Sequence, residues 1–275
     1  MPELPEVEHI VRALRAAIVG RRIVAAELKL KRTAPGTSKP AFSRLLRNAV
    51  ITGISRRGKY ILIELDANRL LTTHLRMTGK FICLTEDDDL PPYAHVVFHL
   101  DDDRRLVFCD MRQFGRMRVV ANRHRLPPEI LSLAPEPLSA DFTEQYFRET
   151  LRKSRRSLKQ LLLDQTRVLG LGNIYAAEAL FLAGVNPMKS AERLSKARSE
   201  KLYRAVRDVL QEAIDAGSTL RIDLADGNGD YIGTSERFWR VYEREGEPCV
   251  RCGAKIRRVV HGGRSTYYCP KCQHN

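Results

Sequence analysis

The sequence lacks any hydrophobic run long enough to cross a membrane, since none approaches the roughly 18 apolar residues that a membrane-spanning helix requires. It does not open on a basic segment followed by an apolar one either. Acidic residues come first, which argues against a cleavable signal. Heptad repeats of apolar residues are also missing. We therefore expect a cytoplasmic protein that has no membrane contact and is a monomer.

Cysteine is scarce, with 6 among 275 residues, and it is unevenly placed. Four cysteines form two Cys-x2-Cys pairs separated by 16 residues: Cys249 and Cys252, then Cys269 and Cys272. The other two, Cys83 and Cys109, stand alone in strand-like runs, which argues against a disulfide framework. The paired spacing is typical of a zinc site with four thiolate ligands. Because four cysteines leave no open coordination position, we predict one structural Zn2+ and no catalytic metal.

Acidic residues are outnumbered, with 33 Asp+Glu against 47 Lys+Arg, and the formal net charge is +14. Such an excess suits a polyanionic partner such as nucleic acid. The charge is not uniform, because residues 151–160 contain five basic side chains and no acidic one, whereas acidic residues concentrate at 86–89 and 101–103. We interpret this pattern as a basic side of the protein that meets the partner. A solvated basic face is the alternative.

The first 120 residues predict one helix followed by strands. Apolar residues recur at helical spacing from Pro5 to Val19, and Gly20 follows as a stop. Eight short segments rich in β-branched residues come next: 23–30, 50–56, 60–65, 70–75, 80–84, 95–100, 105–110 and 117–120. We predict an α+β protein with several domains, of which the first, residues 1–125, is a β-sandwich with an amphipathic N-terminal helix.

A proline-rich segment follows this domain, and we place a linker there, at residues 126–138. Helical periodicity begins after it, with helices predicted at 141–151, 157–163, 174–183 and 195–216. These helices and the loop after them form a predicted helical domain at residues 139–235. The remaining residues, 236–275, contain the cysteine pairs and two predicted strands, which indicates a zinc-finger β-hairpin.

A glycine-rich segment at 168–180 lies between two of the predicted helices. Its backbone N–H groups at a helix start would suit a phosphate, with Asn173 as the cap. Glycine-rich helix starts are common, so the segment alone assigns no function. It lacks the GK[ST] sequence of a nucleotide-binding loop, and we therefore expect no nucleotide cofactor.

The chain begins Met1-Pro2-Glu3, so removal of Met1 would expose a secondary amine beside a carboxylate. An α-amino group has a pKa of about 7.7–8.0, against about 10.4 for lysine, so near neutral pH much more of it is unprotonated and able to attack a sugar aldehyde. Glu3 would be the matching proton donor. The alternative is that the acidic residues only favour the positive end of the helix.

Four features occur in order along the whole chain: PELPEVE at 2–8, HLRMTG at 74–79, GLGNIYAAE at 170–178 and the four-cysteine finger. Together they resemble formamidopyrimidine-DNA glycosylase. The related endonuclease VIII group shares several of these features but usually has Gly where this chain has Leu4. The sequence therefore favours the formamidopyrimidine branch.

The resemblance implies a base-excision-repair enzyme, both DNA glycosylase and lyase, that acts on oxidised purines such as 8-oxoguanine and formamidopyrimidines in damaged double-stranded DNA. It implies a bacterial-type protein associated with the nucleoid. The helical part would be a helix–two-turn–helix domain with a lesion-capping loop at 220–233. Pro2 would form a Schiff base and Glu3 would donate protons. Lys59 would act in β-elimination, with a phosphate contact as its alternative, and Arg264 in δ-elimination.

The resemblance also implies residues that contact DNA: His74, Met77, His95, Arg112, Phe114, Arg155, Lys159 and Asn173. Met77, Arg112 and Phe114 would fill the gap that an extruded nucleotide leaves, although Met and Phe on strands are ordinarily core residues. His74 and His95 have a core alternative too, because lone histidines usually bond inside the protein. We give this alternative more weight for His95.

The chain departs from the family pattern at two places. Met111 and Gln113 stand where the family commonly has Pro and a basic residue, which removes one positive charge, and the segment 220–233 is idiosyncratic. The preferred lesion is therefore open. Two alternative functions remain, namely an endonuclease VIII-type enzyme for oxidised pyrimidines and a zinc-dependent protein that binds damaged DNA without catalysis.

Overall fold

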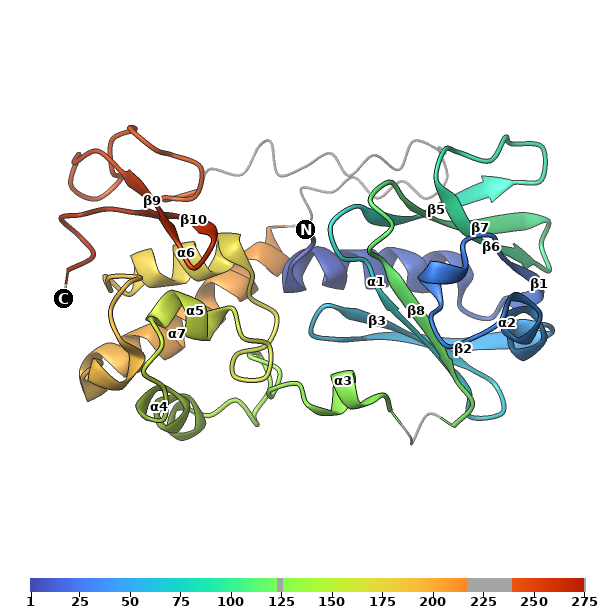
Figure 1. Cartoon of the computed structure of the whole chain (residues 1–275), viewed down its shortest axis with the longest axis horizontal. Coiled ribbons are helices and arrows are strands. Elements are labelled where there is room, and N and C mark those ends of the chain that lie inside the picture. Colours follow the sequence, from blue (N-terminus) through green and yellow to red (C-terminus); the bar gives the residue numbers. More distant parts are fainter. Residues whose placement is uncertain (123–125, 217–238, 275) are drawn as a thin grey trace. The chain divides into compact units, whose positions relative to one another are not determined.

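The computed structural model of the chain (Figure 1) describes residues 1–122, 126–216 and 239–274. Among these residues one compact unit spans Met1–Leu131, and a second comprises 132–216 with 239–274. The division falls inside the proline-rich segment at 126–138. The predicted capping loop at 220–233 and the predicted boundary at 235 lie outside the described residues.

The first unit begins with helix α1, Leu4–Ile18. Pro5 is favourable in its first turn, where the missing N–H would have no intrahelical acceptor. Glu3 and Glu6 form a capping box, and the Glu6 side chain accepts the Glu3 backbone N–H at 2.8 Å. The apolar side of the helix is buried: Leu4, Pro5, Val7, Ile10, Val11, Leu14 and Ile18. Core packing and the capping box together fix the start of α1, directly after Pro2.

Eight strands follow, and all their pairings are antiparallel. They are β1 (Arg22–Leu28), β2 (Ala49–Arg57), β3 (Tyr60–Leu65), β4 (Leu70–His74), β5 (Gly79–Thr85), β6 (Ala94–Leu100), β7 (Arg104–Asp110) and β8 (Arg116–Val120). They form two halves, in the orders β5-β7-β6-β1 and β2-β3-β4-β8. The halves are joined where β1 and β2 pair over two residues. The predicted β-sandwich with its N-terminal helix is confirmed.

The sequence did not predict the short helix α2 (Lys39–Leu46), which follows a 3-10 turn, η1 (Lys31–Thr33). Ser38 caps α2 by accepting a backbone N–H of the first turn at 3.3 Å. Phe42 and Leu46 are fully buried and join the core of the sandwich. Because these two are the only buried residues of α2, the segment has too few apolar positions for helical periodicity to be recognised.

The second unit is helical, as predicted. The described helices outside the sandwich are α3 (Pro128–Leu131), α4 (Glu144–Arg152), α5 (Leu158–Leu162), α6 (Asn173–Leu182), η2 (Ala191–Arg193) and α7 (Lys196–Asp215). Of these, α3 ends the first unit. Helix α6 is buried on all sides from Tyr175 to Phe181. Its N-cap is Gly172, whose backbone is extended, and not Asn173, which is already helical. The predicted cap is therefore wrong by one residue.

Glu178 is the one charged residue inside the buried part of α6, and it is 1% exposed. Its carboxylate accepts the backbone N–H groups of Arg240, Val241 and Tyr242 at 2.9, 2.9 and 3.0 Å. These bonds replace the water that the charge loses on burial. Glu178 thereby fixes the segment 240–242 to α6.

The finger hairpin consists of β9 (Arg257–His261) and β10 (Arg264–Tyr268), joined by Gly262 and Gly263 with φ of +57° and +74°. Arg251 attaches the finger to the end of α6. Its guanidinium donates to the carbonyls of Phe181 and Leu182 at 3.0 and 3.1 Å and lies 4.5 Å from the Phe181 ring centroid. The finger and the helices therefore belong to one packed unit. Across the described parts of both units, no helix is sufficiently long and apolar to span a membrane.

We predict that Glu178→Ala lowers the free energy of unfolding by about 3–5 kcal/mol, because three buried N–H groups lose their acceptor. Urea unfolding checks this. Glu212→Ala is the matched control, since Glu212 is half-exposed and bonds the same Arg240 at 2.8 Å as a surface pair. Its loss should cost less than about 1 kcal/mol. Equal losses for the two variants would contradict the buried-acceptor explanation.

Candidate functional site

The N-terminal pair lies at the start of α1. Pro2 is partly exposed, whereas Glu3 is buried with 3% of its surface exposed. Met1 is half-exposed at 48%, and its amide bond occupies the Pro2 nitrogen. The nitrogen becomes a secondary amine only when Met1 is removed. A buried carboxylate held beside that position suits proton transfer to a group that the amine attacks.

Lys59 lies in the tight turn between β2 and β3. The turn contains two residues, and Gly58 precedes Lys59 with a φ of +56°. Two-residue hairpin turns require such a left-handed residue, which explains the glycine. Lys59 is 5% exposed, so the turn holds a largely buried ammonium group.

His74 ends β4 and packs edge-on against Tyr60, with ring centroids 4.7 Å apart. Its Nδ1 accepts the Arg76 backbone N–H at 3.0 Å. Burial, reinforced by the positive charges of Arg76 and Lys59, lowers the pKa of His74 to about 3. The ring is therefore neutral near pH 7, and its proton lies on Nε2. A neutral N–H of this kind can donate to a phosphate oxygen.

Two loops that carry the proposed gap-filling residues meet at Asp110, which is 1% exposed. One Asp110 oxygen accepts the Thr78 hydroxyl and, at 3.3 Å, the Arg112 backbone N–H. The other accepts the Gly115 N–H at 2.6 Å. A Cβ on Gly115 would lie 2.5 Å from the Phe108 ring, so the loop requires glycine there. Asp110 thereby ties the loop at 75–78 to the loop at 111–115.

These loops leave the predicted gap-filling residues exposed. Met77 is 46% and Phe114 40% exposed, and the exposed Arg112 guanidinium lies 5.1 Å from the Phe114 ring centroid. Large apolar side chains in the core would be buried. The core alternative therefore does not describe Met77 and Phe114 in this structure.

His95 is buried at 7% exposure, and its Nε2 bonds to the Asp110 carbonyl at 2.8 Å. Because a carbonyl only accepts, Nε2 carries the proton and donates it. The core alternative describes His95 in this structure, where its bond holds the end of β7.

Lys159 is placed differently from the predicted DNA contact, because it is completely buried. Its ammonium donates to the Ser265 carbonyl at 2.6 Å and to the Thr266 hydroxyl at 2.8 Å. Asn173 donates to the same Ser265 carbonyl at 3.0 Å. Both residues thus hold β10. The predicted DNA contact is corrected for Lys159, because a bonded, buried ammonium cannot meet a phosphate without leaving its partners, whereas the Asn173 amide has a second N–H.

The tip of the hairpin also rests on α5. His261 and Ser157 form a bond of 2.7 Å between Nε2 and Oγ, and a Cβ on Gly262 would meet the Gln160 amide at 2.8 Å. Arg264, next to this tip, is exposed. The hairpin that carries Arg264 is therefore fixed by its contacts with α5 and α6, and Arg264 itself faces solvent. Arg155 is also presented to solvent, with 92% of its side chain exposed and Glu192 3.7 Å away.

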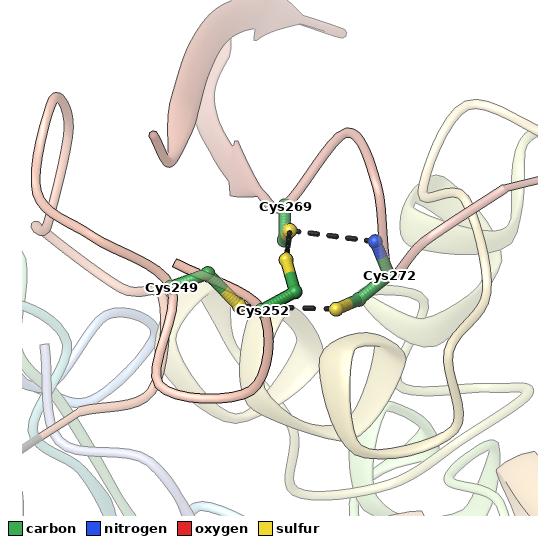
Figure 2. Close-up of side chains that lie close together, drawn as sticks. All are labelled: Cys249, Cys252, Cys269 and Cys272. Atoms are coloured by element: carbon green, nitrogen blue, oxygen red, sulfur yellow. Dashed lines mark hydrogen bonds between the residues drawn. The ribbon is translucent and has the colours of Figure 1, made fainter. Parts of the chain in front are cut away.

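The four predicted zinc ligands converge (Figure 2). Their sulfur atoms all lie within 4.8 Å of one another, with Cys249 and Cys272 3.8 Å apart and Cys252 and Cys269 3.5 Å apart. Four thiolates at about 2.3 Å from a tetrahedral Zn2+ would be about 3.8 Å apart, so the set fits the ion. The backbone N–H groups of Arg251 and Cys272 donate to Cys249 and Cys269 at 3.4 Å, as outer-shell bonds to thiolate ligands do. The ion would have a structural role.

Sequence reasoning missed the residues that support the candidate site from inside. These are Thr78, Asp110, Ser157, Glu178 and His261. Each acts through a contact with another segment of its own unit, and none belongs to a local pattern that identifies such a partner. A buried charge cannot be distinguished from an exposed one by its sequence neighbours alone.

We predict that folding stability falls as the pH drops from about 6.5 towards 3, partly because of His74. Between these values the unfolded chain binds a proton that native His74 excludes, so the contribution is complete above pH 6.5 and is lost below it. The full slope is about 1.4 kcal/mol per pH unit. Urea unfolding at pH 7, 6 and 5 should give a shallower slope for His74→Gln than for the unchanged chain. A histidine NMR titration of His74 with a midpoint near 6.5 would contradict this.

We also predict that Cys269→Ala reduces bound zinc from one ion per chain to none and destabilises the finger. Its side chain is fully buried among the residues that join the finger to α6, so the loss affects packing as well as coordination. Metal analysis and thermal unfolding check this. Cys83→Ala, which removes a buried thiol of the sandwich, should retain the ion. Full zinc content in Cys269→Ala would show that the cluster is not the binding site.

Three family models match the chain. The formamidopyrimidine-DNA glycosylase N-terminal domain matches residues 1–117, and the H2TH domain of the same enzyme matches residues 133–223. A zinc finger found in formamidopyrimidine-DNA glycosylase and isoleucyl-tRNA synthetase matches residues 246–275.

Similar proteins cover the whole chain. The formamidopyrimidine-DNA glycosylase of Heliobacterium modesticaldum is 44% identical over 277 residues, covering 99% of this chain and 100% of the relative. That of Pelotomaculum thermopropionicum is 42% identical over 280 residues, covering 99% of each. Both alignments run from the sandwich to the finger.

Solved structures of the Lactococcus lactis enzyme are similar in fold. Its complex with DNA that contains an abasic site has a TM-score of 0.91 at 37% identity, covering 99% of this chain and 100% of that one. A complex of a variant of the same enzyme with DNA that contains Fapy-dG has a TM-score of 0.91 at 38% identity, covering 100% of both chains. The chain therefore belongs to the formamidopyrimidine-DNA glycosylase family, as its sequence features and four-cysteine finger indicated.

Proposed function

We propose that this chain excises oxidised purines from damaged duplex DNA and cuts the strand at the resulting site. The observation that carries the proposal is the start of α1, where a partly exposed Pro2 precedes a buried Glu3 that is held in a capping box. Removal of Met1 turns this position into a secondary amine with a fixed carboxylate beside it. Family membership supports the same assignment.

The chemistry follows from that amine. The Pro2 nitrogen attacks C1′ of the damaged nucleotide and loses its proton, while the base leaves with the bonding electron pair and takes up a proton. The C1′–O4′ bond then breaks, O4′ takes up a proton, and the sugar opens to an iminium. The iminium makes the C2′ proton acidic, so its removal expels the 3′ phosphate, and a second elimination expels the 5′ phosphate. Glu3 transfers protons to and from the sugar, and Lys59 acts in the first elimination.

The second unit supplies positive charge for DNA. Arg264 acts in the second elimination and contacts phosphates next to the lesion, and Arg155 contacts the backbone. The anchored hairpin supports this role, because a fixed arginine loses less conformational entropy on binding than one on a mobile loop. His74 and Asn173 complete the phosphate contacts, with His74 acting as a neutral donor.

Extrusion of the damaged nucleotide leaves a gap in the duplex, and unstacking costs a few kcal/mol. Phe114 inserts between bases, Met77 fills the vacated space, and Arg112 bonds to the unpaired partner base. Their exposure on two loops joined through Asp110 supports this assignment. Side chains that replace a stacked base must be both accessible and held in place.

Oxidised pyrimidines are the second candidate substrate class. One structural neighbour is a complex of the Lactococcus lactis enzyme with DNA that contains an oxidised pyrimidine. Purine and pyrimidine lesions must therefore be compared directly. We further propose a monomer in the bacterial cytoplasm, associated with the nucleoid through its excess of positive charge and independent of a nucleotide cofactor.

We predict that Pro2→Gly and Glu3→Gln each reduce excision of 8-oxoguanine by at least about a hundredfold while duplex binding is retained. The measurement is borohydride trapping on an 8-oxoguanine:cytosine duplex, followed by mass spectrometry of the N-terminal peptide. The unchanged protein should carry a DNA remnant on Pro2. Protein that retains Met1 is the matched control, because its amide nitrogen cannot form an iminium.

The outcomes separate the alternatives. Trapping on an abasic-site duplex but not on an 8-oxoguanine duplex would support the lyase activity and reject 8-oxoguanine as the substrate lesion. Faster excision of thymine glycol than of 8-oxoguanine would select the endonuclease VIII type. Binding without any adduct would select a non-catalytic DNA-binding protein.

A further inference from the structure

Two polar attachments join helix α1 to strand β2. The Arg15 guanidinium donates to the Ile54 carbonyl at 3.1 and 2.7 Å. Seven residues earlier on the helix, the Glu8 carboxylate accepts Arg56 Nε at 3.0 Å. The two attachments lie about 10 Å apart along the helix axis. Together they supplement the core packing that holds α1 on β2.

The Glu8–Arg56 pair is largely shielded from water, with 20% and 12% of the two side chains exposed. The other Glu8 oxygen accepts Arg12 Nε at 3.0 Å. Burial raises the pKa of Glu8, but the bonds and charges of Arg56 and Arg12 outweigh it and leave the pKa below its usual value. The pair is therefore a charge-assisted bond near neutral pH, stronger and better directed than a neutral one.

Arg56 reaches beyond Glu8 to the turn that carries Lys59. Its Nη1 donates to the Gly58 carbonyl at 3.2 Å. That carbonyl belongs to the peptide group that links Gly58 to Lys59. One planar guanidinium thus bonds α1 through Nε and the Lys59 peptide through Nη1, in a fixed fork geometry that the single ammonium nitrogen of a lysine does not have.

We propose that Glu8 and Arg56 are positioning residues that set Lys59 relative to the start of α1. The inference rests on the function proposed above, because that function assigns Pro2 and Glu3 to one step and Lys59 to the next. These groups lie on separate elements, and Arg56 bonds to both, to Glu8 of α1 and to the Gly58 carbonyl of the β2–β3 turn. A misplacement of about 1 Å between reacting groups costs about a hundredfold in rate.

The test is single-turnover reaction with a preformed abasic-site duplex, in which borohydride-trapped adduct and nicked strand are measured in parallel. Pro2 stays in place in Glu8→Gln and Arg56→Lys, so adduct formation should remain within about twofold of the unchanged chain. Nicking should slow by about tenfold or more, because the Lys59 peptide loses the directed bond from Arg56. The trapped intermediate therefore accumulates relative to product, which a general loss of stability would not produce.

Arg12→Gln is the matched control. It removes the other partner of Glu8, and Arg12 is 53% exposed. Because Arg12 makes no bond to the turn among those described, adduct formation and nicking should both match the unchanged chain.

The charge-reversed double variant Glu8→Lys with Arg56→Glu distinguishes the attachment of α1 to β2 from the positioning of Lys59. It restores an ion pair of opposite polarity between α1 and β2, so the urea midpoint should return towards that of the unchanged chain. A carboxylate at position 56 cannot donate to the Gly58 carbonyl, so nicking should stay slow.

Nicking at the unchanged rate in both single variants would overturn the inference. Equal slowing of adduct formation and nicking would also overturn it, since the pair would then contribute only to stability. If the unchanged chain neither forms an adduct nor nicks the abasic duplex, the proposed function itself fails. The two failures are therefore distinguishable.

Discussion

Hydrogen bonds between a largely buried charged side chain and the main chain of another segment are the interaction on which each candidate site depends. Asp110 bonds to the loop at 111–115, Lys159 to the Ser265 carbonyl of the finger hairpin, and Glu178 to the backbone of 240–242. In the same way, Arg56 bonds to the turn that carries Lys59. In each case the charge lies on a regular element or at its end, and the bonded group lies in a loop, in a turn or in the short hairpin strand β10. These bonds thus anchor segments that face solvent to the packed core.

Charge is suited to this task because such segments cannot be held by their own apolar side chains. Arg112, Phe114 and Arg264, the side chains proposed to meet DNA, are exposed, so the segments that carry them can be fixed through their backbone. Burying an ion is costly unless several bonds replace its hydration. Glu178 has three such backbone bonds, and Asp110 has contacts on both carboxylate oxygens. The same bonds therefore replace the hydration of the buried charge and hold the loop.

Much of this fold could be predicted from the sequence, because its signals are local. Alternating β-branched residues indicated each of the eight strands, and the spacing of the cysteines predicted a cluster whose sulfurs lie within 4.8 Å. The burial of Lys159 and His95 could not be predicted from local signals. Lys159 stands in a basic run that indicated a surface for a polyanionic partner, yet its partners in this structure are 106 and 107 residues away in the chain. His95 bonds to a carbonyl 15 residues away, on another strand. Burial of a polar side chain depends on such distant partners, and one sequence does not encode them as a pattern.

Met111 and Gln113, where this chain departs from the family pattern, lie in the loop that Asp110 holds. Asp110 holds their loop through backbone N–H groups and the Thr78 hydroxyl, so loop geometry does not depend on the side chains at positions 111 and 113. Gln113 has a left-handed φ of +57°, which a backbone held from within can maintain. The replacements therefore change what the loop presents, namely one charge fewer and a 59% exposed methionine, and leave the support of Arg112 intact. A weaker attraction to phosphates is then compatible with an undisturbed gap-filling arrangement, because the two properties depend on different atoms of the same loop.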